Sequence, residues 1–395
     1  MIRRLCTAML PLLLAACFQS ENPHFERSVL VQPADLLGQR LNIDDAPSSI
    51  AYDLFRRDKN GGVIWVTDRK GAETTHNQVI PLAGPDSFLF VMNTDEETVQ
   101  YAVLERLKSR AWGMSTIELS RETPFADQNV AYARSIAARH GLSLHVGDGT
   151  TIESPLTADA VLALFRDPEF LGALSMQRST ILLAPGARAA PGEELRLDPD
   201  SMPPALVGVN LQPGTLGRLD GLAKPEGLAG RYLQANPYHE DGLLPTTVRL
   251  LDTGQFEVST KDSRRVLLSL FPFNEAEGQY LAIKDLEYAD EDNPSHAVSI
   301  EHVVRTSDGW IFQSVTVQEC VARSAIVAMH RDLMKRAALR HGLTWNGSDL
   351  SGLKSIGQLA ALFGDGQFTS GLIVDDEHVE RLFSRESIQS KLLDE

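Results

Sequence analysis

Three sequence blocks occur twice in this 395-residue chain, in the same order in each half. The first block is a strand-like run that contains Trp112 in one copy and Trp310 in the other. The second is the tetrapeptide RHGL, at 139–142 and 340–343. The third begins with Leu-Phe and is called the LF block, at 164–174 and 362–372. The spacing between the two copies is nearly the same for all three blocks. An ordered series of matches is the signature of a duplicated unit. We therefore expect a fold built from two related halves.

Each RHGL block has the pattern of a helix end. Apolar residues at helical spacing precede the block in both copies. Arginine together with His140 or His341 in the last turn favours the negative end of the helix dipole. Gly141 and Gly342 then supply the left-handed residue that stops a helix. This pattern gives both histidines a structural role, and we assign neither of them a catalytic one.

Each LF block is typical of a second helix. Thr157 and Ser355 stand at the expected N-cap positions, and Gln358 completes a capping box in the second copy. Phe165 and Phe363 follow on the apolar face of each helix. We expect both phenylalanines in the core.

Strand signals precede each pair of helices. Alternating runs follow turn residues, for example at 60–68, 98–105, 252–260 and 297–304. Consecutive strands joined by short turns predict an antiparallel meander. The expected fold class is α+β, in two related halves, each an antiparallel β-meander followed by helices packed on one face.

The first twenty residues have the pattern of an export signal. Arg3 and Arg4 form a basic start, and the apolar run 5–14 follows. A run of this length is too short to span a bilayer, which needs roughly 20 residues as a helix. It has the length of a secretory h-region instead. The small residues Ala15 and Ala16 then lead directly into Cys17.

This order of parts resembles the lipobox of bacterial lipoproteins. The resemblance implies that Cys17 carries fatty acyl chains such as palmitate and is the first residue of the mature chain. An ordinary signal peptide with an incidental cysteine is the alternative. Several acyl chains, at about 0.8 kcal/mol per buried CH₂, hold a protein on a membrane. Phe18 stands where many members retained at the inner membrane have aspartate, so the resemblance implies the outer membrane, facing the periplasm.

These signals divide the chain into six segments. A stretch rich in proline and glycine separates the two halves. The expected segments are a signal peptide at 1–16, a tether at 17–47, the first α+β repeat at 48–184, a linker at 185–228, the second repeat at 229–375 and a C-terminal tail, with a helix as one option, at 376–395.

Charge and cysteine content narrow the function classes. The net charge of −16 comes from 53 acidic and 37 basic residues, so the surface repels nucleic acid phosphates. Cys6 belongs to the signal and Cys17 to the anchor. Cys320 remains alone, which excludes an internal disulfide and is typical of a small buried apolar residue.

A search for reactive patterns assigns no catalytic, metal or cofactor residue. His330 and His341 share a helix, about 16 Å apart by helical rise, too far for one metal. His145 and Asp148 could ligate a metal, with a plain turn as the alternative. The stretch 290–293 has oxygen ligands suited to calcium, with an acidic hairpin loop as the alternative. The known nucleophile, phosphate-loop and zinc motifs do not occur in the sequence.

Two functions remain open. The first is a lipid-anchored envelope protein that presents a non-catalytic binding or scaffold surface to an envelope protein or a ligand. Its only membrane contact is through the acyl chains on Cys17. The second is a membrane-tethered hydrolase that acts on an envelope polymer. The first is favoured because the duplicated elements are explained as scaffold.

Overall fold

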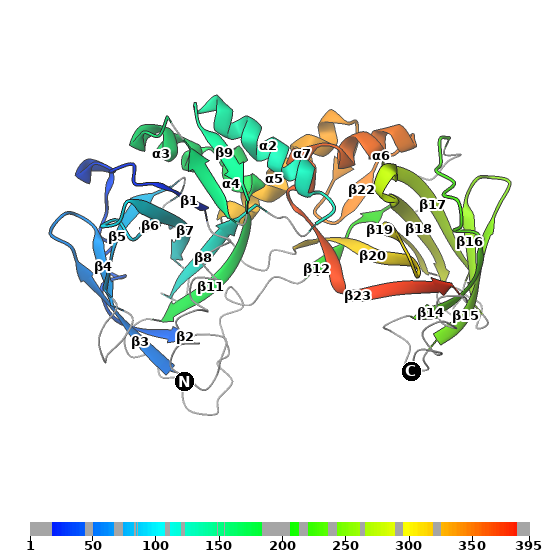
Figure 1. Cartoon of the computed structure of the whole chain (residues 1–395), viewed down its shortest axis with the longest axis horizontal. Coiled ribbons are helices and arrows are strands. Elements are labelled where there is room, and N and C mark those ends of the chain that lie inside the picture. Colours follow the sequence, from blue (N-terminus) through cyan, green and yellow to red (C-terminus); the bar gives the residue numbers. More distant parts are fainter. Residues whose placement is uncertain are drawn as a thin grey trace. The chain divides into compact units, whose positions relative to one another are not determined.

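The computed structural model describes most of the chain (Figure 1). The described residues are 18–43, 50–66, 74–82, 84, 86–106, 111–119, 123–147, 149–153, 155–183, 206–212, 220–235, 243–260, 265–288, 295–318 and 325–384. They fall into two compact units. Unit 1 holds the described residues up to 183, and unit 2 holds those from 206 onward. Two short segments belong to the other unit. Thr123–Phe125 are part of unit 2, and residues 325–330 are part of unit 1.

Eight strands of unit 1 form a closed antiparallel barrel, called barrel 1 below. They are β2 (Gly38–Ile43), β3 (Ile50–Arg57), β4 (Val63–Val66), β5 (Thr74–Pro81), β6 (Ser87–Met92), β7 (Thr98–Arg106), β8 (Trp112–Glu118) and β11 (Ser175–Leu183). Strands β2 to β8 pair in chain order, and β11 pairs with both β8 and β2. Each barrel strand therefore has two neighbours, which leaves none of the eight as a sheet edge.

The other elements of unit 1 lie outside the eight barrel strands, and their strands join the barrel at β7. They are β1 (Phe18–Glu21), η2 (Arg27–Val29), α2 (Ala126–Arg139), β9 (Ser143–Val146), β10 (Thr150–Glu153), α3 (Ala158–Arg166) and α4 (Pro168–Ala173). Strand β1 is antiparallel to β7 and parallel to β10, and β10 is antiparallel to β9. These strands extend the barrel wall into a mixed sheet.

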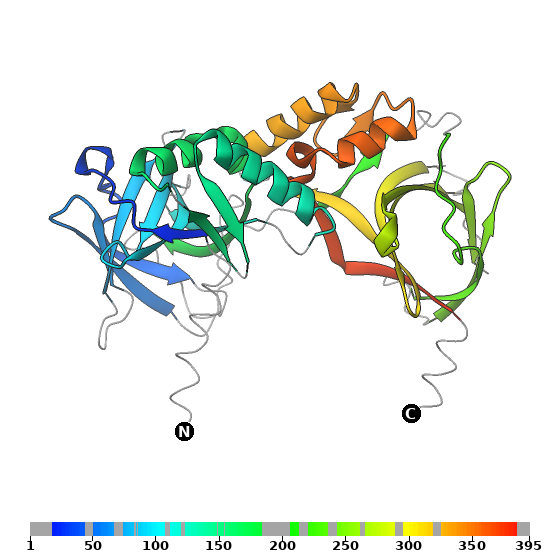
Figure 2. The same cartoon turned by 45° about the horizontal axis from the view of Figure 1, so that its top comes forward.

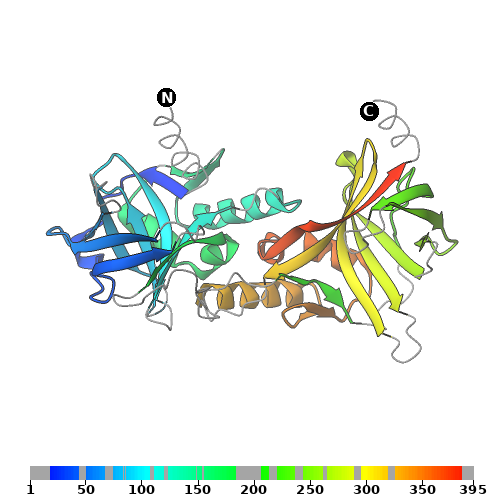
Figure 3. The same cartoon turned by 90° about the horizontal axis from the view of Figure 1, so that it is seen from below.

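Unit 2 closes into a barrel in the same way, called barrel 2 below. Its strands are β14 (Gly230–Ala235), β15 (Leu243–Leu250), β16 (Phe256–Thr260), β17 (Arg265–Asn274), β18 (Gln279–Tyr288), β19 (Ser295–Thr306), β20 (Gly309–Gln318) and β23 (Leu372–Ser384). Strand β23, red in Figure 2, pairs with both β20 and β14. The long hairpin of β18 and β19, in yellow tones, can be followed in Figure 3.

The remaining elements of unit 2 repeat the pairings of unit 1. They are β12 (Leu206–Gly208), β13 (Asn210–Leu211), η4 (Glu275–Glu277), α5 (Ala325–Arg340), β21 (Thr344–Trp345), β22 (Asp349–Ser351), α6 (Ile356–Phe363) and α7 (Gly366–Thr369). Strand β13 is antiparallel to β19 and parallel to β22, and β22 is antiparallel to β21. Strand β12 is an addition that pairs with β20.

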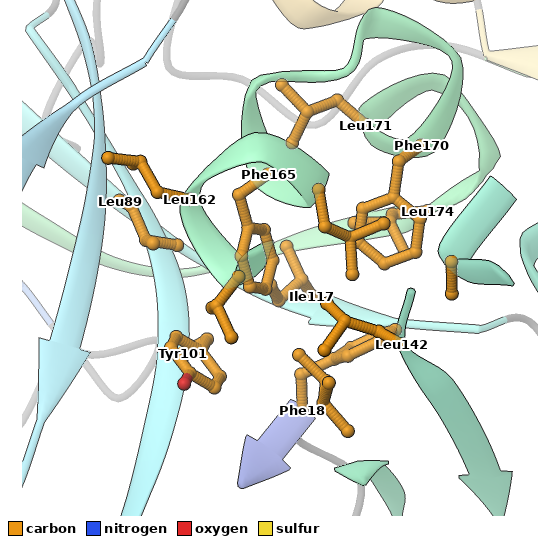
Figure 4. Packing of buried hydrophobic residues seen from close by; sticks show 14 of the residues in the cluster. Phe18, Leu89, Tyr101, Ile117, Leu142, Leu162, Phe165, Phe170, Leu171 and Leu174 are labelled. Atoms are coloured by element: carbon orange, nitrogen blue, oxygen red, sulfur yellow. The ribbon is translucent and has the colours of Figure 1, made fainter. Parts of the chain in front are cut away.

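Unit 1 has two apolar clusters, one on each side of its barrel wall. The inner cluster includes Phe88, Phe90 and Trp112 and fills barrel 1. The outer cluster joins β1, β7 and β8 to α2, α3 and α4. Figure 4 shows its centre, where the fully buried ring of Phe18 meets Phe165 edge-on, with ring centroids 6.3 Å apart. The first described residue of the chain is therefore part of a core.

The expected α+β fold class is wrong. Strand residues far outnumber helix residues among those described, and the meander does not stay open with helices packed on one face. It closes on itself as an antiparallel barrel, with a mixed sheet beside it. The strands that follow the helices, β11 and β23, cause this closure. Their partners lie far away in the chain, and local patterns do not record such pairing.

Strands also occupy segments that the sequence suggested were irregular. Strands β1 and β2 lie in the expected tether, 17–47. Strands β12 and β13 lie in the expected linker, 185–228. Strand β23 runs from the second repeat into the expected tail, 376–395. Strands as short as β1, β12 and β13 contain too few residues for an alternating pattern to be recognised.

We predict that truncation after residue 375 abolishes the folding of unit 2. The truncation removes most of β23, including Leu382, which is 2% exposed in the core of barrel 2. It also leaves β14 and most of β20 without a partner on one side, which exposes sheet edges. Calorimetry should show the loss of one unfolding transition. A chain truncated after Ser384 should keep it, and a normal transition in the shorter chain would contradict the role of β23.

Candidate functional site

The RHGL and LF blocks contact each other in both units. In unit 1, His140 Nε2 lies 2.9 Å from Asp167 Oδ2. In unit 2, His341 Nε2 lies 3.0 Å from Asp365 Oδ2. The two aspartates belong to the LF blocks, so two of the repeated blocks are joined by the same His–Asp contact.

Each aspartate also caps a helix. Asp167 accepts a hydrogen bond from the backbone N–H of Glu169 at the start of α4. Asp365 accepts one from Gln367 at the start of α7. Burial opposes ionisation of Asp365, but hydrogen bonds from Arg340, His341 and the Gln367 backbone outweigh it, so its pKa lies below the usual value. These contacts hold the end of one helix to the start of another.

The other repeat markers lie in matching elements. Trp112 is in β8 and Trp310 in β20, and both indoles are buried inside their barrels. Gly141 and Gly342 follow α2 and α5 with φ of +73° and +71°, which is the left-handed cap conformation. Phe165 in α3 and Phe363 in α6 are fully buried.

Several residues considered from the sequence lie outside the described residues. Cys17, Cys320, Asp148 and the stretch 290–293 are among them. His145 is exposed on β9, the last strand of its sheet. The sequence candidates therefore form no joint site within the described residues.

One end of each barrel is filled by a leucine just before the first strand. Leu36 and Leu228 are fully buried in the two inner clusters. A side chain from the first strand holds each in place. Arg40 Nε donates to the Leu36 carbonyl at 3.2 Å, and Tyr232 Oη donates to the Leu228 carbonyl at 3.0 Å.

Barrel 2 contains a charged cluster, formed by Lys284, Glu301 and Glu380. Lys284 on β18 alternates with two apolar residues of the inner cluster, so its side chain points into the barrel. Its Nζ lies 2.9 Å from Glu301 Oε1 on β19 and 2.9 Å from Glu380 Oε1 on β23. The hairpin of β18 and β19 and the distant strand β23 thus bring their charges together.

Two uncharged side chains extend the charged cluster. The amide of Gln234 on β14 donates to Glu380 Oε2 at 3.4 Å, a long hydrogen bond. Thr246 Oγ1 on β15 donates to Gln234 Oε1 at 3.0 Å and fixes the orientation of that amide. Five of the eight barrel strands therefore contribute to one polar network.

Exposure decreases along the charged cluster. The side chain of Glu380 is 21% exposed, that of Lys284 10% and that of Glu301 6%. The second carboxylate oxygen of Glu301, Oε2, is buried and accepts no hydrogen bond within the described part of the chain. A buried acceptor without a donor costs about 1–3 kcal/mol, and more when it is charged.

Burial and mutual attraction set the protonation of the cluster. Burial lowers the pKa of Lys284, but the two glutamates outweigh it, so the pKa lies above the usual value and the ammonium stays charged. Burial raises the pKa of Glu301, with Lys284 opposing and Glu380 adding to the effect. With all three groups ionised, the cluster carries one net negative charge.

Barrel 1 has apolar residues at the matching positions. The hairpins β6–β7 and β18–β19 pair in the same register relative to the two barrel tryptophans. This register places Met92 where barrel 2 has Lys284, and Ala102 where it has Glu301. Ala102 is 1% exposed and lies in the inner cluster of barrel 1. The barrel can therefore close without charges at these two positions.

The charged cluster can bind but is poorly suited to catalysis by its carboxylates. Both glutamates give an oxygen to the same ammonium, so neither is a free general base. Its members are separated by up to 96 residues in the chain, and no short motif contains them. The one signal in the sequence is the lysine at 284, which stands on the apolar side of an alternating run.

Searches for known features and relatives gave no match. Within the described residues, no helix is both long and apolar enough to cross a membrane. In the same residues, no group of three or more His, Cys, Asp or Glu side chains could hold a metal ion. Comparisons with protein-family models, curated proteins and solved structures found nothing similar to this chain.

We predict that Lys284→Met alone strongly destabilises unit 2. The substitution leaves two glutamates buried without their cation, and breaking a buried ion pair in this way costs about 3–5 kcal/mol. Denaturant unfolding followed by hydrogen exchange in β18 and β19 measures the change. Lys354→Met, at an exposed lysine of the same unit, should stay within about 0.5 kcal/mol of wild type. Equal stability of the two variants would contradict a buried charge pair.

We predict small and similar effects for His140→Gln and His341→Gln. Each substitution removes a partly exposed His–Asp contact at a helix end, which contributes about 1 kcal/mol at most. Thermal unfolding measures the loss. His145→Gln, on the exposed side of β9, serves as the control. A loss above about 3 kcal/mol in either variant would show that the contact does more than join two helices.

Proposed function

We propose that this chain is a lipid-anchored protein of the cell envelope that binds a ligand in barrel 2 and has no catalytic role. The acyl chains on Cys17 attach it to the outer membrane, and both units face the periplasm. The observation that carries the binding role is the charged cluster. It is buried in barrel 2, while the matching positions of barrel 1 are Met92 and Ala102.

General properties of closed barrels support this role. An eight-stranded barrel is just wide enough to be filled by side chains or to hold one small ligand. Such a barrel provides a rigid wall from which a few polar groups can converge. In barrel 2 the Leu228 end is apolar and filled, and the polar groups gather around Lys284 instead.

The start of the fold adds a condition to the lipid anchor. Phe18, the residue after Cys17, is fully buried and begins β1. Consecutive Cα atoms are about 3.8 Å apart, so an acylated Cys17 would be one residue away from the core of unit 1. Under this proposal unit 1 is held close to the lipid surface, with no long tether in between.

We predict that Cys17→Ser abolishes fatty-acid labelling. Cells that express the chain with an alkyne fatty-acid probe should label the wild type and Cys6→Ser, because Cys6 lies in the expected signal peptide. The Cys17→Ser protein should be unlabelled and absent from the washed membrane fraction, since no acyl chain holds it there. Labelling of Cys17→Ser at the wild-type level would overturn the lipid anchor.

A further inference from the structure

We infer that the charged cluster of barrel 2 binds an organic cation, a ligand whose head is an ammonium or guanidinium group. This inference rests on the binding role proposed above and names the class of ligand. The first reason is charge. Two carboxyl groups face one ammonium, so the site carries a net negative charge whenever both are ionised, and a bound cation would favour that state against the burial that raises the pKa of Glu301.

The second reason is the free acceptor. Lys284 occupies Oε1 of both glutamates, and the Gln234 amide faces Oε2 of Glu380. Glu301 Oε2 is left as the buried oxygen to which no described residue donates. A ligand N–H would satisfy it with a charge-assisted hydrogen bond, which is stronger than a neutral one.

The third reason is selectivity among cations. The ammonium of Lys284 lies 2.9 Å from an oxygen of each glutamate and occupies the positions that a divalent ion would need. An organic cation needs only one acceptor and can approach along the exposure gradient, from Glu380 toward Glu301.

The apolar residues of barrel 1 suggest a control variant of barrel 2 that should still fold. The double substitution Lys284→Met with Glu301→Leu gives barrel 2 apolar side chains at positions where barrel 1 has Met92 and Ala102. Leucine is used instead of alanine because it is closer to glutamate in volume. Replacing a buried ion pair by apolar residues of similar volume is often neutral for stability. The variant therefore removes the charges of Lys284 and Glu301 together and keeps Glu380, whose side chain is the most exposed of the three.

The test is calorimetric titration of the full-length protein in detergent with n-butylammonium chloride at neutral pH. Tetramethylammonium chloride is the matched probe, because it has the same charge and no N–H donor. The wild type should bind butylammonium at least tenfold more tightly than tetramethylammonium. Glu301→Gln should weaken butylammonium binding at least tenfold, and the double variant, which lacks the free acceptor Glu301 Oε2, should weaken it at least as much. Hydrogen exchange in β18 checks that each variant is folded.

Three results would overturn the inference. They are no binding of butylammonium to the wild type, equal binding of the two probes, or unchanged binding in the folded double variant. None of them would affect the lipid anchor, which is tested by Cys17 labelling. Conversely, loss of the anchor with intact butylammonium binding would overturn the membrane part of the proposed function and leave the cation site standing.

Discussion

Both units depend on the pairing of one late strand with the first strand of a meander. Strand β11 joins β2 to β8, and β23 joins β14 to β20. Without these strands each meander would expose two edges and one side of its inner core. The helices sit within this closure, because the chain forms α2 to α4, or α5 to α7, before it returns to the barrel. The His–Asp contacts of the RHGL and LF blocks hold the helices of this segment together before the chain returns to the barrel.

The same barrel frame carries two different interiors. At the leucine-filled end both barrels bury a tryptophan, Trp112 or Trp310, but barrel 1 also buries Arg40 and Asp53 where barrel 2 uses Tyr232. At the other positions compared they differ, since barrel 1 has Met92 and Ala102 where barrel 2 has Lys284 and Glu301. Burying an ion pair seldom increases stability over apolar packing. Barrel 1 shows that charges at these two positions are not needed for closure, although it buries other charges, and a ligand accounts better for Lys284 and Glu301 than the needs of the fold do.

Local features could be read from the sequence, and features that depend on distant pairing could not. Ser355 and Gln358 form the expected capping box, and Thr157 caps α3 as expected. The helices also end at the RHGL blocks. The closing strands β11 and β23 were missed because their partners are far away in the chain. The charged cluster was missed in part for the same reason, because Glu380 on β23 joins Lys284 and Glu301 only after the barrel has closed.

The most direct measurement is the unfolding free energy of the Lys284→Met/Glu301→Leu double variant in the absence of any added ligand. If the cluster serves binding and not folding, the double variant should be as stable as the wild type or up to about 4 kcal/mol more stable. Denaturant unfolding of unit 2, followed by hydrogen exchange in β18 and β19, gives this value. A loss of several kcal/mol in the double variant would show that barrel 2 needs its buried charges to fold, and would contradict the account.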